Sequence, residues 1–141
     1  PLSIGGQFEG TYEPAGGFYP YIFSSLSFLP GEVNDLIISE SNIYTALSTS
    51  NGAYRISLDN EGQVIDAISF ADGYSLNSID ENNDIIAVAA GHDGVLLYEF
   101  SSIEPTFLGQ IETPYSNKVR IYGNDIIICT EDGLYIYTLN N

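Results

Sequence analysis

Apolar and polar residues alternate with a period of two in three segments of the chain, each following a polar residue and a glycine. The large apolar side chains of these segments are Tyr54, Ile56 and Leu58, then Leu96, Tyr98 and Phe100, then Tyr135, Tyr137 and Leu139. A period of two places alternate side chains on opposite faces of a β-strand. The pattern predicts half-buried strands, and no stretch of the chain indicates a helix.

The segments belong to a repeat of about 42 residues. At this offset Leu26-Ser27-Phe28 aligns with Ile68-Ser69-Phe70, and Asn51-Gly52 aligns with Asp93-Gly94, without a gap. A third copy follows at a slightly shorter offset, with Asp132-Gly133 in the equivalent place. Because type I′ turns need positive φ at both central residues, these three dipeptides predict two-residue hairpins.

Each full copy contains four predicted strands. In the second copy they span about residues 74–79, 85–90, 95–100 and 107–111. Four short antiparallel strands that recur at a fixed period are typical of β-propeller blades. We therefore predict an all-β fold of the β-propeller type, with about three four-stranded antiparallel blades, as a partial propeller or half of an oligomeric ring.

The domain prediction divides the chain at residue 20. Residues 1–20 contain Pro14, Gly16, Gly17 and Pro20 and predict an irregular N-terminal arm. The alternative is a decayed preceding hairpin, because Gly10-Thr11-Tyr12 lies 42 residues before Gly52-Ala53-Tyr54. Residues 21–141 hold the repeats, in blades at about 33–70, 74–111 and 117–139. An outermost strand near 23–28 precedes them.

Two segments resemble the LVIVD-type repeats of bacterial and archaeal surface propellers. One runs from Gly94 through Phe100 to Glu104-Pro105 and Gly109, and the other from Asn124 through Gly133 to Tyr137. The first copy departs from the pattern, because Asp59-Asn60-Glu61-Gly62 replaces the proline-containing turn. The resemblance implies a propeller fold and a surface location, and it carries over no catalytic motif.

The last copy ends after its third strand, whereas residues 23–28 match a fourth strand. Propellers commonly complete the final blade with a strand from the other terminus, which would bring the total to three blades. Since propellers typically have at least four blades, we expect another protein chain to complete the ring. That partner is a second copy, in a homo-oligomer, or the remaining blades of a larger assembly from which this chain is a fragment.

Charge and composition narrow the partners further. Three basic residues oppose 19 acidic ones, for a net charge of −16, which repels nucleic acid and anionic lipid. No apolar run is long enough to span a bilayer, so no membrane insertion is expected. Few lysines and many Tyr, Asn, Ser and Gly favour an extracellular or cell-surface setting. The single cysteine, Cys129, follows Ile126-Ile127-Ile128 and is predicted to be a buried core thiol.

Candidate chemistry is sparse. His92 stands beside Asp93 in a predicted hairpin, where Ser50 and Glu131 occupy the equivalent positions, so we interpret it as a turn residue and predict no catalytic residues. Asp80, Glu81 and Asp84 offer oxygen ligands in one turn, which suits a weak Ca²⁺ site, although solvated turn residues are the alternative. No other cofactor is expected.

These features lead to three competing functions. The first is a non-enzymatic extracellular or cell-surface propeller module for protein interaction or structural assembly. The second is a subunit of an extracellular filament or surface layer that assembles by strand donation. The third is a ligand-binding or hydrolytic propeller whose site is completed by blades outside this chain.

Overall fold

A computed structural model describes residues 7–12, 21–26 and 29–140, and these form β-strands and loops without a helix. The chain divides into two compact units, Pro1–Pro30 and Gly31–Asn141. In the described part of the chain no helix is present that could cross a membrane.

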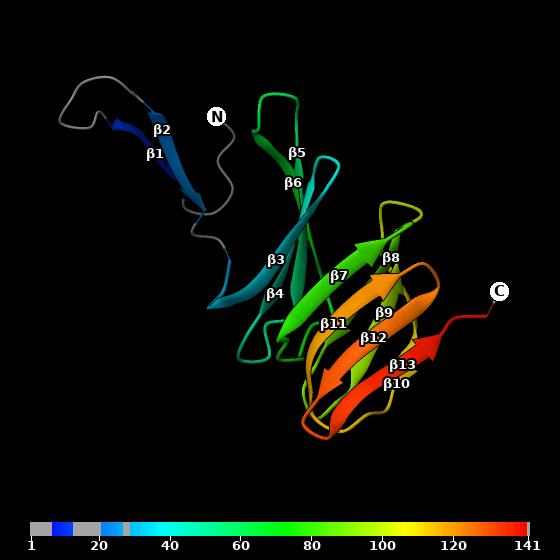
Figure 1. Ribbon diagram of the computed structural model, residues 1–141. Coiled ribbons are helices and arrows are strands. Elements are labelled where there is room, and N and C mark those ends of the chain that lie inside the picture. Colours follow the sequence, from blue (N-terminus) through cyan, green and yellow to red (C-terminus); the bar gives the residue numbers. More distant parts are fainter. Residues whose placement is uncertain (1–6, 13–20, 27–28, 141) are drawn as a thin grey trace. The chain divides into compact units, whose positions relative to one another are not determined.

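The second unit contains three antiparallel sheets (Figure 1). The first sheet is built from β3 (Val33–Ser39), β4 (Asn42–Leu47), β5 (Ala53–Leu58) and β6 (Val64–Phe70). The second sheet is built from β7 (Ser78–Asn82), β8 (Ile85–Ala89), β9 (Val95–Glu99) and β10 (Thr106–Ile111). The third sheet is built from β11 (Ser116–Tyr122), β12 (Asp125–Thr130) and β13 (Gly133–Thr138).

The strands of each sheet follow one another in chain order, and none of the sheets closes into a barrel. The predicted strands of the second copy agree with β8, β9 and β10, whereas β7 begins at Ser78 and not at residue 74. The preceding residues connect the first two sheets: Leu76 donates its amide to the Leu47 carbonyl at 2.9 Å, and Gly52 donates to the Tyr74 carbonyl at 2.9 Å.

The first unit contains a single hairpin among its described residues. Gln7–Tyr12 forms β1 and pairs antiparallel with β2, Tyr21–Leu26. The segment predicted to be irregular thus contains a strand. The strand predicted near 23–28 pairs with β1, whereas the sequence suggested that it completes the last sheet; its residues 27 and 28, and residues 1–6 and 13–20 of the predicted arm, lie outside the described residues.

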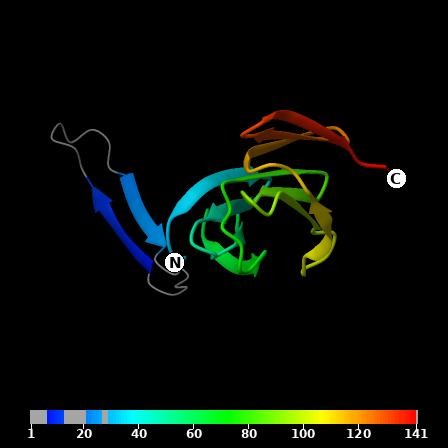
Figure 2. The same cartoon turned by 90° about the horizontal axis from the view of Figure 1, so that it is seen from below.

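The second sheet lies between the other two and packs on both of its faces. One face contributes Val88, Leu96, Phe100 and neighbouring residues to a core shared with Tyr44 and Phe70 of the first sheet. Its other face contributes Ala87, Val95 and Leu97 to a core shared with Val119, Ile126 and Ile128 of the third sheet. Figure 2 shows the third sheet, coloured orange to red, along one side of the second. Because side chains alternate between the two faces along β8 and β9, these strands contribute residues to both cores.

The first strands of the three sheets, β3, β7 and β11, lie side by side (Figure 1). A repeated hydrogen bond joins them at their beginnings. Asn34 donates its side-chain amide to the Leu76 carbonyl at 2.9 Å, and Asn77 donates to the Ser116 carbonyl at 3.0 Å. We call this bond the asparagine clamp. The sheets are therefore related by a repeated contact and not only by a repeated sequence.

The tight turns differ from the predicted hairpins. Gly52, Gly94 and Gly133 have positive φ, but Asn51, Asp93 and Asp132 do not, so none of these pairs forms a type I′ turn. Two consecutive residues with positive φ occur instead at Asn83-Asp84, between β7 and β8, and at Thr49-Ser50, between β4 and β5. Five residues, 90–94, connect β8 and β9. Within this loop the Ala90 amide donates to the Gly94 carbonyl at 2.7 Å.

Candidate functional site

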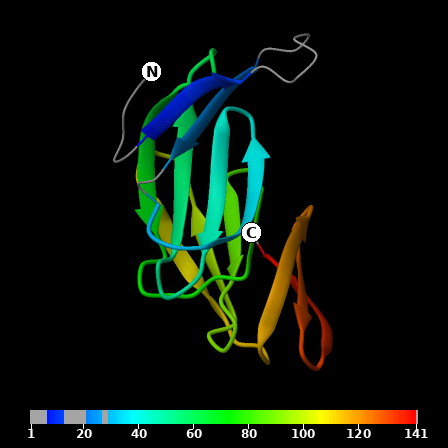
Figure 3. The same cartoon turned by 90° about the vertical axis from the view of Figure 1, so that its left-hand side faces the viewer.

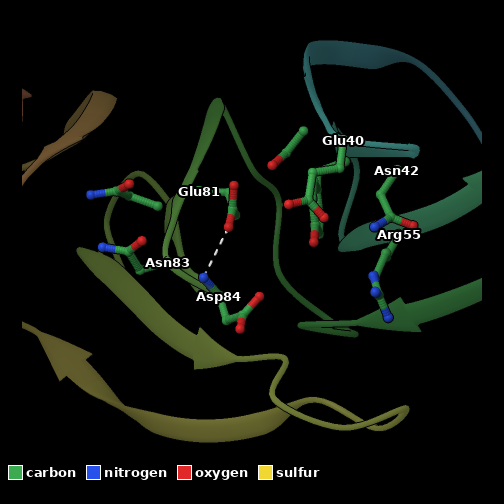
Figure 4. Close-up of a pocket in the computed structure, with 9 residues that line it drawn as sticks. Glu40, Asn42, Arg55, Glu81, Asn83 and Asp84 are labelled. Atoms are coloured by element: carbon green, nitrogen blue, oxygen red, sulfur yellow. Dashed lines mark hydrogen bonds between the residues drawn. The ribbon is translucent and has the colours of Figure 1, made fainter.

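A polar pocket of about 370 Å³ lies between the first and second sheets, where the turns of β3–β4 and β7–β8 approach each other (Figure 4). Its lining contains Arg55 and three carboxylates, those of Glu40, Glu81 and Asp84. Glu81 holds the turn beneath it, because its carboxylate accepts a hydrogen bond of 2.9 Å from the Asp84 amide. The pocket follows from the packing of two sheets, and neither sheet forms it alone.

Arg55 is the unusual residue of this pocket. It lies in β5 at a position that β9 fills with Leu97, and its guanidinium carbon stands 4.8 Å from the centroid of the Phe100 ring. Cation–π contact of this kind stabilises a partly desolvated guanidinium. The Nε atom is buried and makes no hydrogen bond. Sequence reasoning missed this residue, although a basic residue inside an apolar strand was the available signal.

The electrostatics of the pocket act on Tyr44, which is buried beside Arg55. Burial raises the pKa of the Tyr44 phenol above its usual value, because the phenolate loses its hydration. Arg55 lowers the pKa in part, and the charges of Glu81 and Asp84 raise it again. Tyr44 therefore stays neutral at physiological pH, where it acts as a polar wall of the pocket and not as a base.

The three residues predicted to bind calcium do not all face the same region. The Asp80 carboxylate accepts the Ile121 amide of β11 at 2.7 Å, whereas Glu81 and Asp84 line the pocket toward the first sheet. Adjacent residues of a strand point to opposite faces, so Asp80 and Glu81 are directed apart. The described residues contain no group of three or more His, Cys, Asp or Glu that could hold a metal ion. The calcium site stays a prediction.

His92 lines a second pocket, of about 280 Å³, together with Ser50, Ser75 and Tyr115. Its exposed ring packs edge-on against Tyr115, with 4.8 Å between the ring centroids. The Ser75 hydroxyl accepts a hydrogen bond of 2.7 Å from the Ser50 amide, which fixes the neighbouring loops. A base and hydroxyl groups share this pocket, but no hydrogen bond links His92 to either serine among the described residues.

The third sheet ends the stack with an open edge and an open face (Figure 3). In the other two sheets the third strand, β5 or β9, is paired on both sides, whereas β13 pairs only with β12 among the described strands. All six residues of β13 are exposed, including Leu134, Tyr135, Ile136 and Tyr137. β13 therefore combines unpaired backbone groups at its edge with uncovered apolar side chains on both faces.

The free face of the third sheet also contains Cys129, whose predicted burial is wrong. Cys129 is exposed, because Ile126 and Ile128 point into the core with the second sheet and alternation directs Cys129 away from it. Cross-strand pairing places Cys129 beside Lys118 and Leu134, and Ile127 beside Ile136. We define the free face of the third sheet by Lys118, Ile127, Cys129, Leu134 and Ile136.

Comparisons with known proteins give the fold alone. No protein-family profile matches the chain, and no curated protein shows significant sequence similarity to it. Among solved structures, the chain is similar to the computationally designed Ika4 protein, with a TM-score of 0.50 and 9% identity. The match covers 82% of this chain and 96% of the designed one. At this identity the similarity concerns the arrangement of strands and not the residues of any site.

Proposed function

We propose that the chain is a non-enzymatic β-propeller-type module that serves protein interaction or structural assembly. The repeated strand order, with four strands in two sheets and three in the last, supports the propeller assignment, as do the face-to-face packing and the row of first strands. The small number of lysines and the many Tyr, Asn, Ser and Gly residues support an extracellular or cell-surface setting.

A single observation carries the proposed function. β13 has the sequence of an interior strand but the position of an edge strand, since its counterpart β9 is buried at Val95 through Tyr98 and paired with β10. An edge strand presents unpaired backbone groups that can add another strand. The partner we propose supplies an extended segment that takes the place β10 has in the second sheet.

The experiment uses a synthetic peptide with the sequence of residues 104–113, which contains β10. Amide hydrogen exchange of the intact chain is followed with and without the peptide. We expect protection of alternate amides in β13, because only every second amide faces the added strand.

Two control peptides make the experiment specific. One has a scrambled sequence, and the other carries N-methyl groups on the amides that would donate to β13. Protection by the N-methylated peptide, or no protection by the native peptide at millimolar concentration, would contradict the proposal.

A further inference from the structure

The three sheets can be aligned residue by residue at the turn between their first and second strands. Glu40-Ser41, Asn83-Asp84 and Gly123-Asn124 occupy the same place in this turn. Counting back from it makes Leu36, Ile79 and Val119 equivalent. Their partners on the second strand are equivalent too, and they are Thr45, Val88 and Ile128.

One half of a sheet-to-sheet interface is exposed on the first sheet. Ile79 and Val119 are fully buried, each against the sheet that precedes its own. Leu36 has the same position in β3 but is 53% exposed, and Ile38 on the same face is 69% exposed. The first sheet thus presents the side that the second and third sheets bury.

The complementary half is exposed on the third sheet. Val95 and Leu97 of β9 are buried against the third sheet, and their equivalents in β13 are Leu134 and Ile136. These two side chains are 63% and 62% exposed. One chain therefore carries both halves of one more copy of an interface that it already forms twice, at opposite ends of the stack (Figure 1).

The asparagine clamp has a third member with no acceptor. Asn117 is equivalent to Asn34 and Asn77, is exposed, and has no hydrogen-bond partner for its side chain among the described residues. The acceptors of the two formed clamps, Leu76 and Ser116, directly precede the next asparagine in sequence. The corresponding acceptor of a second copy is the carbonyl of Val33, which directly precedes Asn34.

The net charge of −16 on each copy opposes their association, but one local pair of opposite charges fits the same pairing. The chain has three basic residues, and Lys118, which is exposed, is one of the two on β11. The Ile79 amide donates to the Asp35 carboxylate, and the Val119 amide donates to the Ser78 hydroxyl. Asp35 and Ser78 hold equivalent positions in β3 and at the start of β7, so this position contacts the first strand of the following sheet. In the third sheet the residue at this position is Lys118, which has no acceptor for an amide. The register places it at the Leu36 amide of a second copy, beside the acidic Asp35, whose carboxylate already accepts that amide at 2.9 Å.

We propose that the free face of the third sheet binds the first sheet of a second copy, through the face of β3 that carries Leu36 and Ile38. This inference rests on the proposed function and adds a second contact to it, on the face of the third sheet and not on the edge of β13. The contact is head-to-tail, so it joins two different surfaces and generates a closed ring or a filament.

The test uses two single variants of the full chain. Leu36→Glu destroys the half on the first sheet, and Ile136→Glu destroys the half on the third sheet. Wild-type mass, measured by light scattering, should increase with protein concentration, and each variant alone should remain a monomer. An equimolar mixture should form a dimer and nothing larger, because the two intact halves stand on different chains.

Lys118→Glu is the variant that separates charge from apolar contact. It should weaken association at least tenfold at low salt, and added salt should reduce its difference from the wild type. Far-ultraviolet circular dichroism and thermal unfolding control for folding, and all three substitutions are at exposed positions, which should leave both unchanged.

Cys129 supplies a second measurement without a new substitution. Its equivalents Ala46 and Ala89 are fully buried between sheets, so association should bury the thiol. Alkylation by iodoacetamide should slow as the wild-type concentration increases, and it should stay constant for Ile136→Glu.

Two results would overturn the inference. One is a wild-type chain that stays monomeric at millimolar concentration, and the other is a mixture of the two variants that does not dimerise. Failure of the inference is distinct from failure of the proposed function: a monomeric chain that still binds the β10 peptide at β13 refutes only the second copy as the partner.

Discussion

Gly94 and Gly62 are two residues with similar backbone conformations and different surroundings. Their φ angles are 74° and 79°, a region that residues with a Cβ atom rarely adopt. A Cβ on Gly94 would overlap the carbonyl oxygen of Ile111, whereas no atom lies within 4 Å of the same position at Gly62. Gly94 is thus required both by its positive φ and by the lack of space for a Cβ atom.

We expect Gly94→Ala to lower the free energy of unfolding by more than about 2 kcal/mol, since it adds a clash to the strain. Gly62→Ala should lower it by about 1 kcal/mol through strain alone. Urea unfolding of the two variants provides the comparison. Equal losses would mean that the close approach of Ile111 is relieved without effect.

Tyr98 makes the free energy of unfolding depend on alkaline pH. It is buried against Phe70, with 5.2 Å between ring centroids, and burial raises its pKa above the usual 10.0, with further increases from Tyr74 and Asp72. The folded pKa exceeds the unfolded one, so the stabilisation is fully present below pH 10.0 and is lost as the pH rises through the folded value.

We expect the free energy of unfolding to fall as the pH rises above 10.0. Tyr98→Phe should flatten this decline, and a remainder should persist because the pKa of Tyr44 is raised as well. Urea unfolding at several pH values measures both slopes. A variant with the wild-type slope would exclude Tyr98 as a source of the pH dependence.

At the scale of single elements, the asparagine clamp allows a matched comparison within one chain. Asn77 forms its bond to the Ser116 carbonyl at 3.0 Å, whereas Asn117 has no partner for its side chain among the described residues. Both residues stand at the beginning of the first strand of a sheet. A following sheet is present only for Asn77, whose side chain also donates to the Tyr115 hydroxyl at 3.3 Å.

Asn77→Ala should therefore lower the free energy of unfolding of the monomer by about 1 kcal/mol, the typical contribution of one hydrogen bond. Asn117→Ala should leave it unchanged and weaken association instead. Thermal unfolding at low concentration and light scattering at high concentration separate the two effects. If Asn117→Ala destabilises the monomer as much as Asn77→Ala does, the two positions are not equivalent in the way proposed.

Strands were predictable at this scale and turns were not. The alternation of Leu96, Tyr98 and Phe100 predicted a strand, and β9 contains the first two of these residues, whose side chains lie in the core shared with the first sheet. The Asp93-Gly94 pair does not form the predicted turn, because only Gly94 has a positive φ, and Gly94 also lies where the backbone passes close to Ile111. A dipeptide signal cannot reveal that a distant carbonyl occupies the space.

In the whole molecule, the three stacked sheets should differ in local stability. The second sheet packs on both faces, whereas the third packs on one and ends in the exposed β13. We expect amide hydrogen exchange in the monomer to be slowest in β8 and β9 and fastest in β13, since local opening follows the number of buried contacts. Uniform protection across the three sheets would contradict this order.

The sequence by itself determined the period of the chain, its all-β class and most of its strand boundaries, because alternation and repeat spacing are local properties of the chain. Only the tertiary structure decided which faces remain open, that Cys129 is exposed, and that Arg55 borders a pocket beside Glu81. The burial of a side chain depends on whether a neighbouring sheet covers it. Leu36 and Ile136 are apolar residues in strands, as buried residues are, and the sequence alone does not show that both are exposed.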